Sequence, residues 1–141
     1  MISVCRRLQV IASEDIGAAY PMAASIVHAC VSSARELGLP EARIPIANAV
    51  ITLATAPKSN SAYLALDAAT ADITAGLGNE MPKHLRAPKY EGYVYPHDFP
   101  NHYTPQQYLP DDVKHKKYYV PADNKTERAA REYWENIKNK K

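Results

Sequence analysis

The chain has 141 residues, of which 46% are hydrophobic and 23% are charged, and its formal net charge is +2. Such values are ordinary for one globular domain that can bury a core, so we expect a single domain over residues 1–141. The small net charge does not by itself indicate a nucleic-acid-binding protein, because phosphate binding needs several clustered cations. The two cysteines lack metal or redox spacing, and no apolar run is long enough for a membrane span, which favours a cytoplasmic protein that contacts no membrane.

Hydrophobic spacing predicts helices from the start of the chain. Apolar residues at helical intervals favour a first helix over 2–12, and Gly17 can close its end in the left-handed conformation. A wide apolar face at a period of 3.6 residues favours a second helix over 21–37, beginning at Pro21. A third helix, over 44–56, is apolar nearly all round, so we expect it to be central and surrounded by others.

Residues 53–63 form a short corner between two apolar helices. Pro57 ends the third helix, and the serine and asparagine side chains that follow can cap the next one. That helix is predicted over 60–76, with an apolar stripe on one face. The corner residues that we expect to make core or oligomer contacts are Leu53, Pro57, Ser59, Asn60 and Tyr63.

Residues 82–121 break the helical pattern. Most of the 11 prolines and 10 tyrosines of the chain fall in or after this segment. We expect an irregular, wrapping segment with turns near 105–107 and 110–112. Its many aromatic residues argue against disorder, because disordered linkers are poor in aromatics.

A last helix is predicted over 124–138. Asn124 and Glu127 have the spacing of a capping box, in which the side chains of the first and fourth residues satisfy free backbone N–H groups. The predicted fold is therefore all-α, with an irregular Tyr- and Pro-rich segment before the last helix.

The sequence contains none of the common catalytic motifs. It has no glycine-rich phosphate loop, no nucleophile elbow and no metal-spaced cysteine pair, so we expect no catalytic residue and no cofactor site in this chain alone. The best metal candidate is the set of imidazoles and carboxylate formed by His97, Asp98, His102 and His115. The alternative is that these groups hydrogen-bond within the irregular segment; because their spacing matches no metal site, we expect no bound metal.

A basic patch is a second possibility. Its members would be Lys58, Lys83, His84, Arg86 and Lys89. Tyr90, Tyr93 and Tyr95 would add stacking faces for single-stranded nucleic acid. The alternative is solvated charge beside packed aromatic rings, which the modest net charge favours.

A series of motifs, in this order, resembles the replication-associated recombination protein A (MgsA) family. The motifs are RRL at 6–8, ASEDIG at 12–17, GLPE at 38–41, LATAPKSN at 53–60, HLR at 84–86, YPHD at 95–98, QYLP at 107–110 and KYY at 117–119. They span essentially the whole chain. Two departures stand out: Tyr20 precedes Pro21 where members commonly have Asp, so a helix cap of about 1 kcal/mol is absent, and only 87–94 separate HLR from YPHD, where members carry a longer stretch with Lys and Gly.

The resemblance implies the C-terminal part of an AAA+ ATPase related to clamp loaders. In that family a helical C-terminal domain assembles the protein into a homotetramer, and ATP and Mg²⁺ bind an ATPase domain that this chain lacks. The full-length protein is implied to be a DNA-stimulated ATPase of stalled replication forks and DNA gaps, cytoplasmic and nucleoid-associated, that associates with single-stranded-DNA-binding protein. We therefore expect a clamp-loader-like tetramerisation domain; the alternative is a docking module for DNA or for single-stranded-DNA-binding protein.

Overall fold

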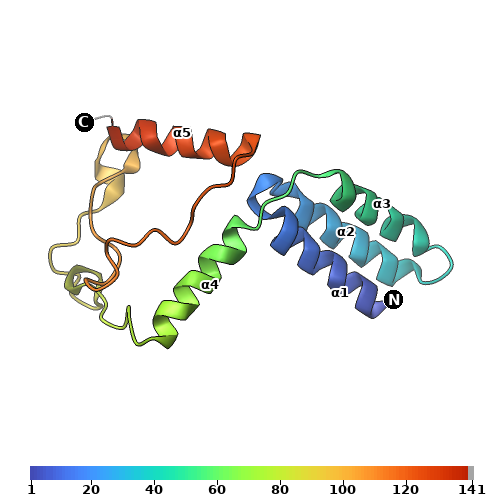
Figure 1. The fold of residues 1–141 in the computed structure, drawn as a ribbon, viewed down its shortest axis with the longest axis horizontal. Coiled ribbons are helices and arrows are strands. Elements are labelled where there is room, and N and C mark those ends of the chain that lie inside the picture. The colour runs from blue at the N-terminus through green and yellow to red at the C-terminus, as the bar shows by residue number, and fades with distance from the viewer. Residues whose placement is uncertain (140–141) are drawn as a thin grey trace. The chain divides into compact units, whose positions relative to one another are not determined.

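The computed structural model describes residues 1–139, and over this range the chain is all-α, as the sequence predicts. Five α-helices and no strand are present in these residues (Figure 1). The helices are α1 (Ile2–Ile11), α2 (Met22–Leu37), α3 (Arg43–Thr55), α4 (Ser61–Thr74) and α5 (Lys125–Asn139). Their ends lie within two residues of the predicted ranges. None of the helices described is long and apolar enough to cross a membrane.

Packing separates two compact units within these residues. Unit 1 comprises Met1–Leu64 and Tyr119–Ala129, and unit 2 comprises Ala65–Tyr118 and the chain from Ala130 onward. Helices α4 and α5 therefore each begin in unit 1 and continue into unit 2.

The hydrophobic core of unit 1 lies between α1, α2 and α3, which run side by side (Figure 1). The α2 face follows the predicted period, since its buried residues recur about every three or four positions. Burial of each larger side chain stabilises the fold by about 1.5–3 kcal/mol. The core residues are Cys5, Leu8, Ala12, Ile16, Ala23, Val27, Cys30, Val31, Ala49 and Leu53.

The end of the first helix contacts the corner that follows α3. After α1 a π-helical turn (Ala12–Ile16) and a 3₁₀ turn (Gly17–Ala19) carry the chain onward. The Ser59 N–H donates a hydrogen bond to the Asp15 carbonyl at 2.8 Å. Gly17 has a φ of +45°, and a Cβ there would lie 2.9 Å from the Ser59 carbonyl oxygen. Glycine is therefore required both by the backbone angle and by the close approach of the corner.

Helix α3 is not the central helix that its composition predicts. Within the described chain it buries only Ala49 and Leu53. Ile44 is 67% exposed and Ile51 is 61% exposed. One face packs against α1 and α2, and apolar residues on the remaining faces, such as Ile44 and Ile51, stay mostly exposed.

In unit 2 the irregular segment is ordered by short turns and side-chain hydrogen bonds. Three 3₁₀ turns occur, at Lys83–Leu85, Pro96–Asp98 and Pro100–His102. The predicted turn at 110–112 is confirmed, since the Val113 N–H donates to the Pro110 carbonyl at 3.1 Å.

The turn predicted near 105–107 is wrong. Gln106 there extends its side chain to another part of the segment: its Oε1 accepts the Val94 N–H at 2.8 Å, and its Nε2 donates to the Val94 carbonyl at 3.3 Å. The amide thus replaces the backbone partners that a regular ladder would supply.

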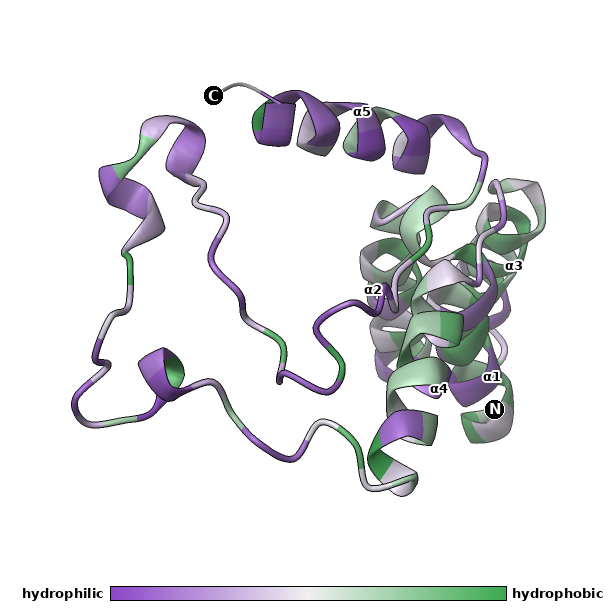
Figure 2. Ribbon diagram, turned by 60° about the vertical axis from the view of Figure 1, so that its left-hand side comes forward, coloured by the Kyte–Doolittle hydropathy of each residue, from purple (hydrophilic) through white to green (hydrophobic). Residues whose placement is uncertain are grey.

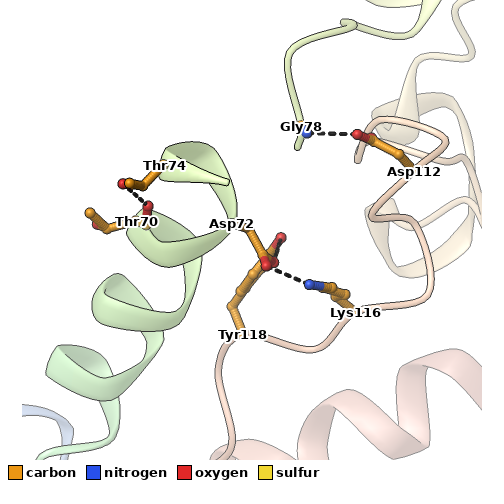
Figure 3. Close-up of polar contacts among 7 residues, drawn as sticks. All are labelled: Thr70, Asp72, Thr74, Gly78, Asp112, Lys116 and Tyr118. Carbon is orange, nitrogen blue, oxygen red and sulfur yellow. Dashed lines mark hydrogen bonds and ion pairs between the residues drawn. The ribbon is translucent and has the colours of Figure 1, made fainter. Parts of the chain in front are cut away.

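Asp72 joins the irregular segment to the second half of α4 (Figure 3). Its carboxylate accepts hydrogen bonds from the Lys116 ammonium and, at 2.8 Å, from the Tyr118 hydroxyl. The bond from Lys116, followed by the bond from Tyr118, lowers the pKa of Asp72 below its usual value. Beyond α4, the Gly78 N–H donates to Asp112 at 2.8 Å, which holds the same segment at a second point.

Candidate interaction surfaces

Helix α4 presents an apolar stripe to solvent. Ser61 is its one buried residue, although hydrophobic residues cover much of the helix (Figure 2). Leu66 is 64% exposed and Ile73 is 63% exposed, and both belong to the stripe that the sequence predicts. The corresponding surface on α3 is formed by Ile44 and Ile51. Large exposed apolar surfaces of this kind mark interaction sites in soluble proteins.

The corner after α3 encloses a buried carboxylate. Glu127, at the start of α5, is only 1% exposed and accepts hydrogen bonds from the Ser61 hydroxyl, the Tyr119 hydroxyl and the Asn124 amide. The Asn124 Oδ1 in turn accepts the Glu127 N–H at 3.0 Å, which confirms the capping interaction that the spacing predicts. The sequence signalled the cap but carried no sign that Ser61 and Tyr119 would share the same carboxylate.

The hydroxyl and amide donors keep Glu127 ionised. Burial by itself raises the pKa of this carboxyl. Hydrogen bonds from Ser59, Ser61, Tyr119 and Asn124 lower it by more than burial raises it, so the pKa falls from 4.5 to about 2. A buried charge held by neutral donors is stable only while all its donors remain in place. Glu127 therefore fixes the beginnings of α4 and α5 within unit 1.

Next to the corner lies an open groove of about 610 Å³ in unit 1. Its charged and polar lining includes Arg7, Asp15, Lys58 and Asn60. Lys58 also donates hydrogen bonds to the carbonyls of Leu53, at 2.9 Å, and Ala56. Its ammonium thus satisfies free carbonyls at the end of α3, where a cation also complements the helix dipole.

Of the corner residues singled out from the sequence, Leu53 and Ser59 are buried. Leu53 belongs to the core of unit 1, and the Ser59 Oγ accepts the Ser61 N–H at 3.3 Å. Pro57 and Asn60 are exposed, and Tyr63 is partly exposed. The corner thus contributes both to the core and to the surface.

Three of the predicted basic residues come together in unit 2. Lys83, Arg86 and Lys89 line one pocket of about 300 Å³, together with Glu91. Lys58 lies in unit 1 and is not among the residues that line this pocket. The sequence analysis did not anticipate an acidic partner within the pocket. The Lys89 ammonium nitrogen lies 3.9 Å from a carboxylate oxygen of Glu91.

A second acidic residue pairs with the pocket's arginine. The Arg86 guanidinium donates to Glu80 at 2.8 Å and to the Met81 carbonyl at 2.8 Å. His84 is held elsewhere, with its Nε2 at 2.8 Å from the Gln107 carbonyl oxygen. Both ion pairs of the pocket are exposed, and such pairs are worth only about 0–1 kcal/mol, so another anion can replace the carboxylates at little cost.

Two histidines of the irregular segment, His97 and His102, make tilted ring contacts with each other and with a tyrosine. The His97 ring lies 4.9 Å from the His102 ring and 5.1 Å from the Tyr95 ring, measured between centroids. No group of three or more metal-ligating residues that could hold an ion occurs among the described residues. Asp98 and His115 therefore do not join His97 and His102 in such a group.

The fold is that of an all-α domain, and comparison with known proteins identifies which one. The chain belongs to the MgsA AAA+ ATPase C-terminal family, whose model matches residues 1–138. The resemblance read from the motifs is thus confirmed. The chain corresponds to the C-terminal domain of these AAA+ ATPases.

Relatives in several bacteria support this assignment. Replication-associated recombination protein A of Bacillus subtilis is 47% identical over 99% of the chain and 35% of its own length. An AAA domain-containing protein of Mycobacterium tuberculosis is 42% identical over 89% of the chain and 30% of its length. Replication-associated recombination protein A of Escherichia coli K12 is 37% identical over 85% of the chain and 29% of its length. The chain thus spans about a third of the length of these curated relatives.

Proposed function

We infer that this chain is an oligomerisation domain that assembles its AAA+ ATPase into a homotetramer for replication-associated recombination. The observation that carries this proposal is the exposure of α4, a helix rich in apolar residues of which only Ser61 is buried. Leaving Leu66 and Ile73 in water forgoes about 25 cal/mol for each Å² of apolar surface that a partner would cover. Closed symmetric assembly is the usual way in which soluble proteins cover exposed apolar surface of this kind.

In this proposal the chain contributes geometry and no chemistry. ATP and Mg²⁺ are assigned to an ATPase domain outside these residues, in line with the larger size of the relatives. A shared assembly would raise the effective concentration of the ATPase domains on one DNA molecule. The full-length protein would be cytoplasmic and nucleoid-associated and would have DNA and single-stranded-DNA-binding protein as partners.

Light scattering after size-exclusion chromatography tests the assembly. The expected mass is four times that of the chain over a wide concentration range. Leu66→Glu should shift the mass toward the monomer, because it places a charge within the covered stripe. Ala68→Glu is the matched control, since Ala68 is also exposed but points to another side of α4. A monomeric wild-type chain, or equal effects of the two substitutions, would overturn the proposal.

A second candidate function is favoured by the basic pocket of unit 2. Lys83, Arg86 and Lys89 supply three cations in one place, and a nucleic-acid backbone is the ligand that such a cluster attracts. Docking of DNA there is compatible with tetramerisation through α3 and α4. Fluorescence anisotropy with labelled DNA over a salt series tests it, because phosphate contacts make the affinity fall as salt rises.

A further inference from the structure

We propose that the basic pocket of unit 2 binds single-stranded nucleic acid and that Tyr90 stacks on one of its unpaired bases. This inference rests on the DNA-docking function proposed above and adds the form of the ligand and the residue that recognises it. It concerns the turn in which Tyr90 directly follows Lys89, one of the cations of the pocket.

The pocket supplies the contacts to phosphate. Among the described residues, Lys83 forms no ion pair, and the carboxylates that pair with Arg86 and Lys89 are exposed. A phosphate group can therefore displace them without uncovering a buried charge. With three cations available, the logarithm of the affinity for a single strand should fall with a slope of about −2 against the logarithm of salt concentration.

Tyr90 supplies an accessible ring next to this pocket along the chain. It lies between Lys89 and Glu91, both of which line the pocket, and the residue is 52% exposed. Its backbone has a φ of +46°, which residues with a Cβ rarely adopt. The turn is fixed from both sides: the Tyr90 N–H donates to the Arg86 carbonyl at 3.1 Å, and the Tyr93 N–H donates to the Tyr90 carbonyl at 3.0 Å.

Packing does not explain an aromatic residue at this position. Glycine or asparagine would satisfy the same turn with less strain, and the Tyr90 ring remains half in water. Strained backbone is concentrated where function requires a particular side chain. Tyr93 differs, because it is less exposed, at 38%, and because partial burial and the neighbouring Tyr108 raise the pKa of its hydroxyl.

Stacking distinguishes a single strand from a duplex. An unpaired base offers its face to an aromatic ring, and each such contact contributes about fivefold or more to affinity. In a duplex the faces of internal bases are stacked on their neighbours, which leaves the phosphates as the groups that the cations can reach. Tyr90 should therefore matter for single strands and not for duplexes, whereas the lysines should matter for both.

The experiment measures the anisotropy of a labelled thymidine oligonucleotide of about 15 nucleotides, and of a blunt duplex of the same length, with the whole chain at low salt. Lys83→Gln with Lys89→Gln should weaken binding of both ligands at least about tenfold and reduce the salt slope. Tyr90→Gly should weaken binding of the single strand about fivefold or more, leave the duplex unchanged, and leave the melting temperature equal or higher. Tyr90→Trp should retain binding of the single strand, and Glu91→Gln should strengthen binding of both ligands.

The experiment distinguishes failure of the stacking inference from failure of the DNA-docking function on which it rests. Binding of the single strand by Tyr90→Gly at wild-type affinity would overturn the stacking inference, while loss of binding in the lysine variant would still support docking. Wild-type affinity in the lysine variant, or no binding by the wild-type chain at low salt, would overturn both. Tyr133→Ala is the control for loss of an exposed tyrosine, since Tyr133 lies on the regular helix α5; an effect equal to that of Tyr90→Gly would also overturn the inference.

Discussion

Ser61 and Glu127 are 66 positions apart in the chain, and the Ser61 hydroxyl donates a hydrogen bond to the buried Glu127 carboxylate. Ser61 is the first residue of α4, and Glu127 lies in the first turn of α5. A single carboxylate thus holds the beginnings of two helices. The ATPase family's LATAPKSN motif ends immediately before Ser61, so this bond connects the motif to the last helix.

Replacing Glu127 by alanine should lower the free energy of unfolding by about 3 kcal/mol, because three side-chain donors would lose a charged acceptor inside the fold. Glu127→Gln should cost less, about 1–2 kcal/mol, since its carbonyl oxygen can still accept one or two bonds. Urea denaturation followed by circular dichroism measures both values. Glu132→Gln, at an exposed position of α5, is the control and should change stability by less than about 0.5 kcal/mol; an equal loss in the control would contradict the prediction.

The depressed pKa of Glu127 predicts a particular loss of stability in acid. Its folded-state pKa of about 2 lies below the unfolded value of 4.5, so ionisation favours the folded state. The contribution is complete above about pH 4.5 and disappears as the pH falls toward 2; the size that corresponds to this shift is ~3 kcal/mol.

Glu127→Gln isolates this contribution from those of other acids whose pKa is also lowered, such as Asp72. The stability of the variant should depend less on pH than that of the wild type between pH 4.5 and 2. The stability advantage of the wild type over the variant should narrow as the pH falls and then reverse, because the ~3 kcal/mol that protonation removes exceeds the cost of the substitution at neutral pH. Parallel curves across this window would show that Glu127 does not titrate as its contacts require.

Gly17→Ala should destabilise unit 1 by about 2–3 kcal/mol. The added Cβ would meet the Ser59 carbonyl oxygen at 2.9 Å, and the φ of +45° is itself unfavourable for alanine. Gly38→Ala is the matched control, because Gly38 has a φ of +69° but nothing within 4 Å of its Cβ position. The control should lose only the backbone contribution, about 1 kcal/mol. Equal losses at the two positions would mean that the approach of the corner to Gly17 contributes nothing.

Local patterns in the sequence were sufficient to predict the helices and the capping interaction of Asn124 and Glu127, because both depend on residues a few positions apart. The exposure of α3 could not be predicted in this way. A helix with apolar residues on every side fits the centre of one chain or the contact between several chains, and periodicity does not distinguish the two.

The candidate sites could be predicted less well, because they depend on side-chain contacts that helical spacing does not determine. The sequence grouped Lys58 with Lys83, Arg86 and Lys89, but Lys58 bonds to the end of α3 while the other three line one pocket in unit 2. Gln106 was expected in a turn and pairs with Val94 instead. Lys58 was misplaced because the spacing of apolar residues does not say where a side chain outside a helix turns, and Gln106 because its partner Val94 lies in a segment without regular periodicity.

Tyr20→Asp should stabilise the chain by about 1 kcal/mol, because it supplies the cap that α2 lacks. The first helical residues follow Pro21, and no side chain caps the N-terminus of α2. Tyr20 has an extended backbone, with φ −144° and ψ 83°, and its carbonyl already accepts the Ala23 N–H at 2.9 Å, as in a capping residue. An aspartate there can accept a hydrogen bond from a free N–H of the first turn, and its charge also complements the helix dipole.

Tyr20→Ala removes the ring without adding a cap, so the thermal stability of the aspartate variant relative to the alanine variant measures the cap alone. No difference between these two variants would contradict the prediction.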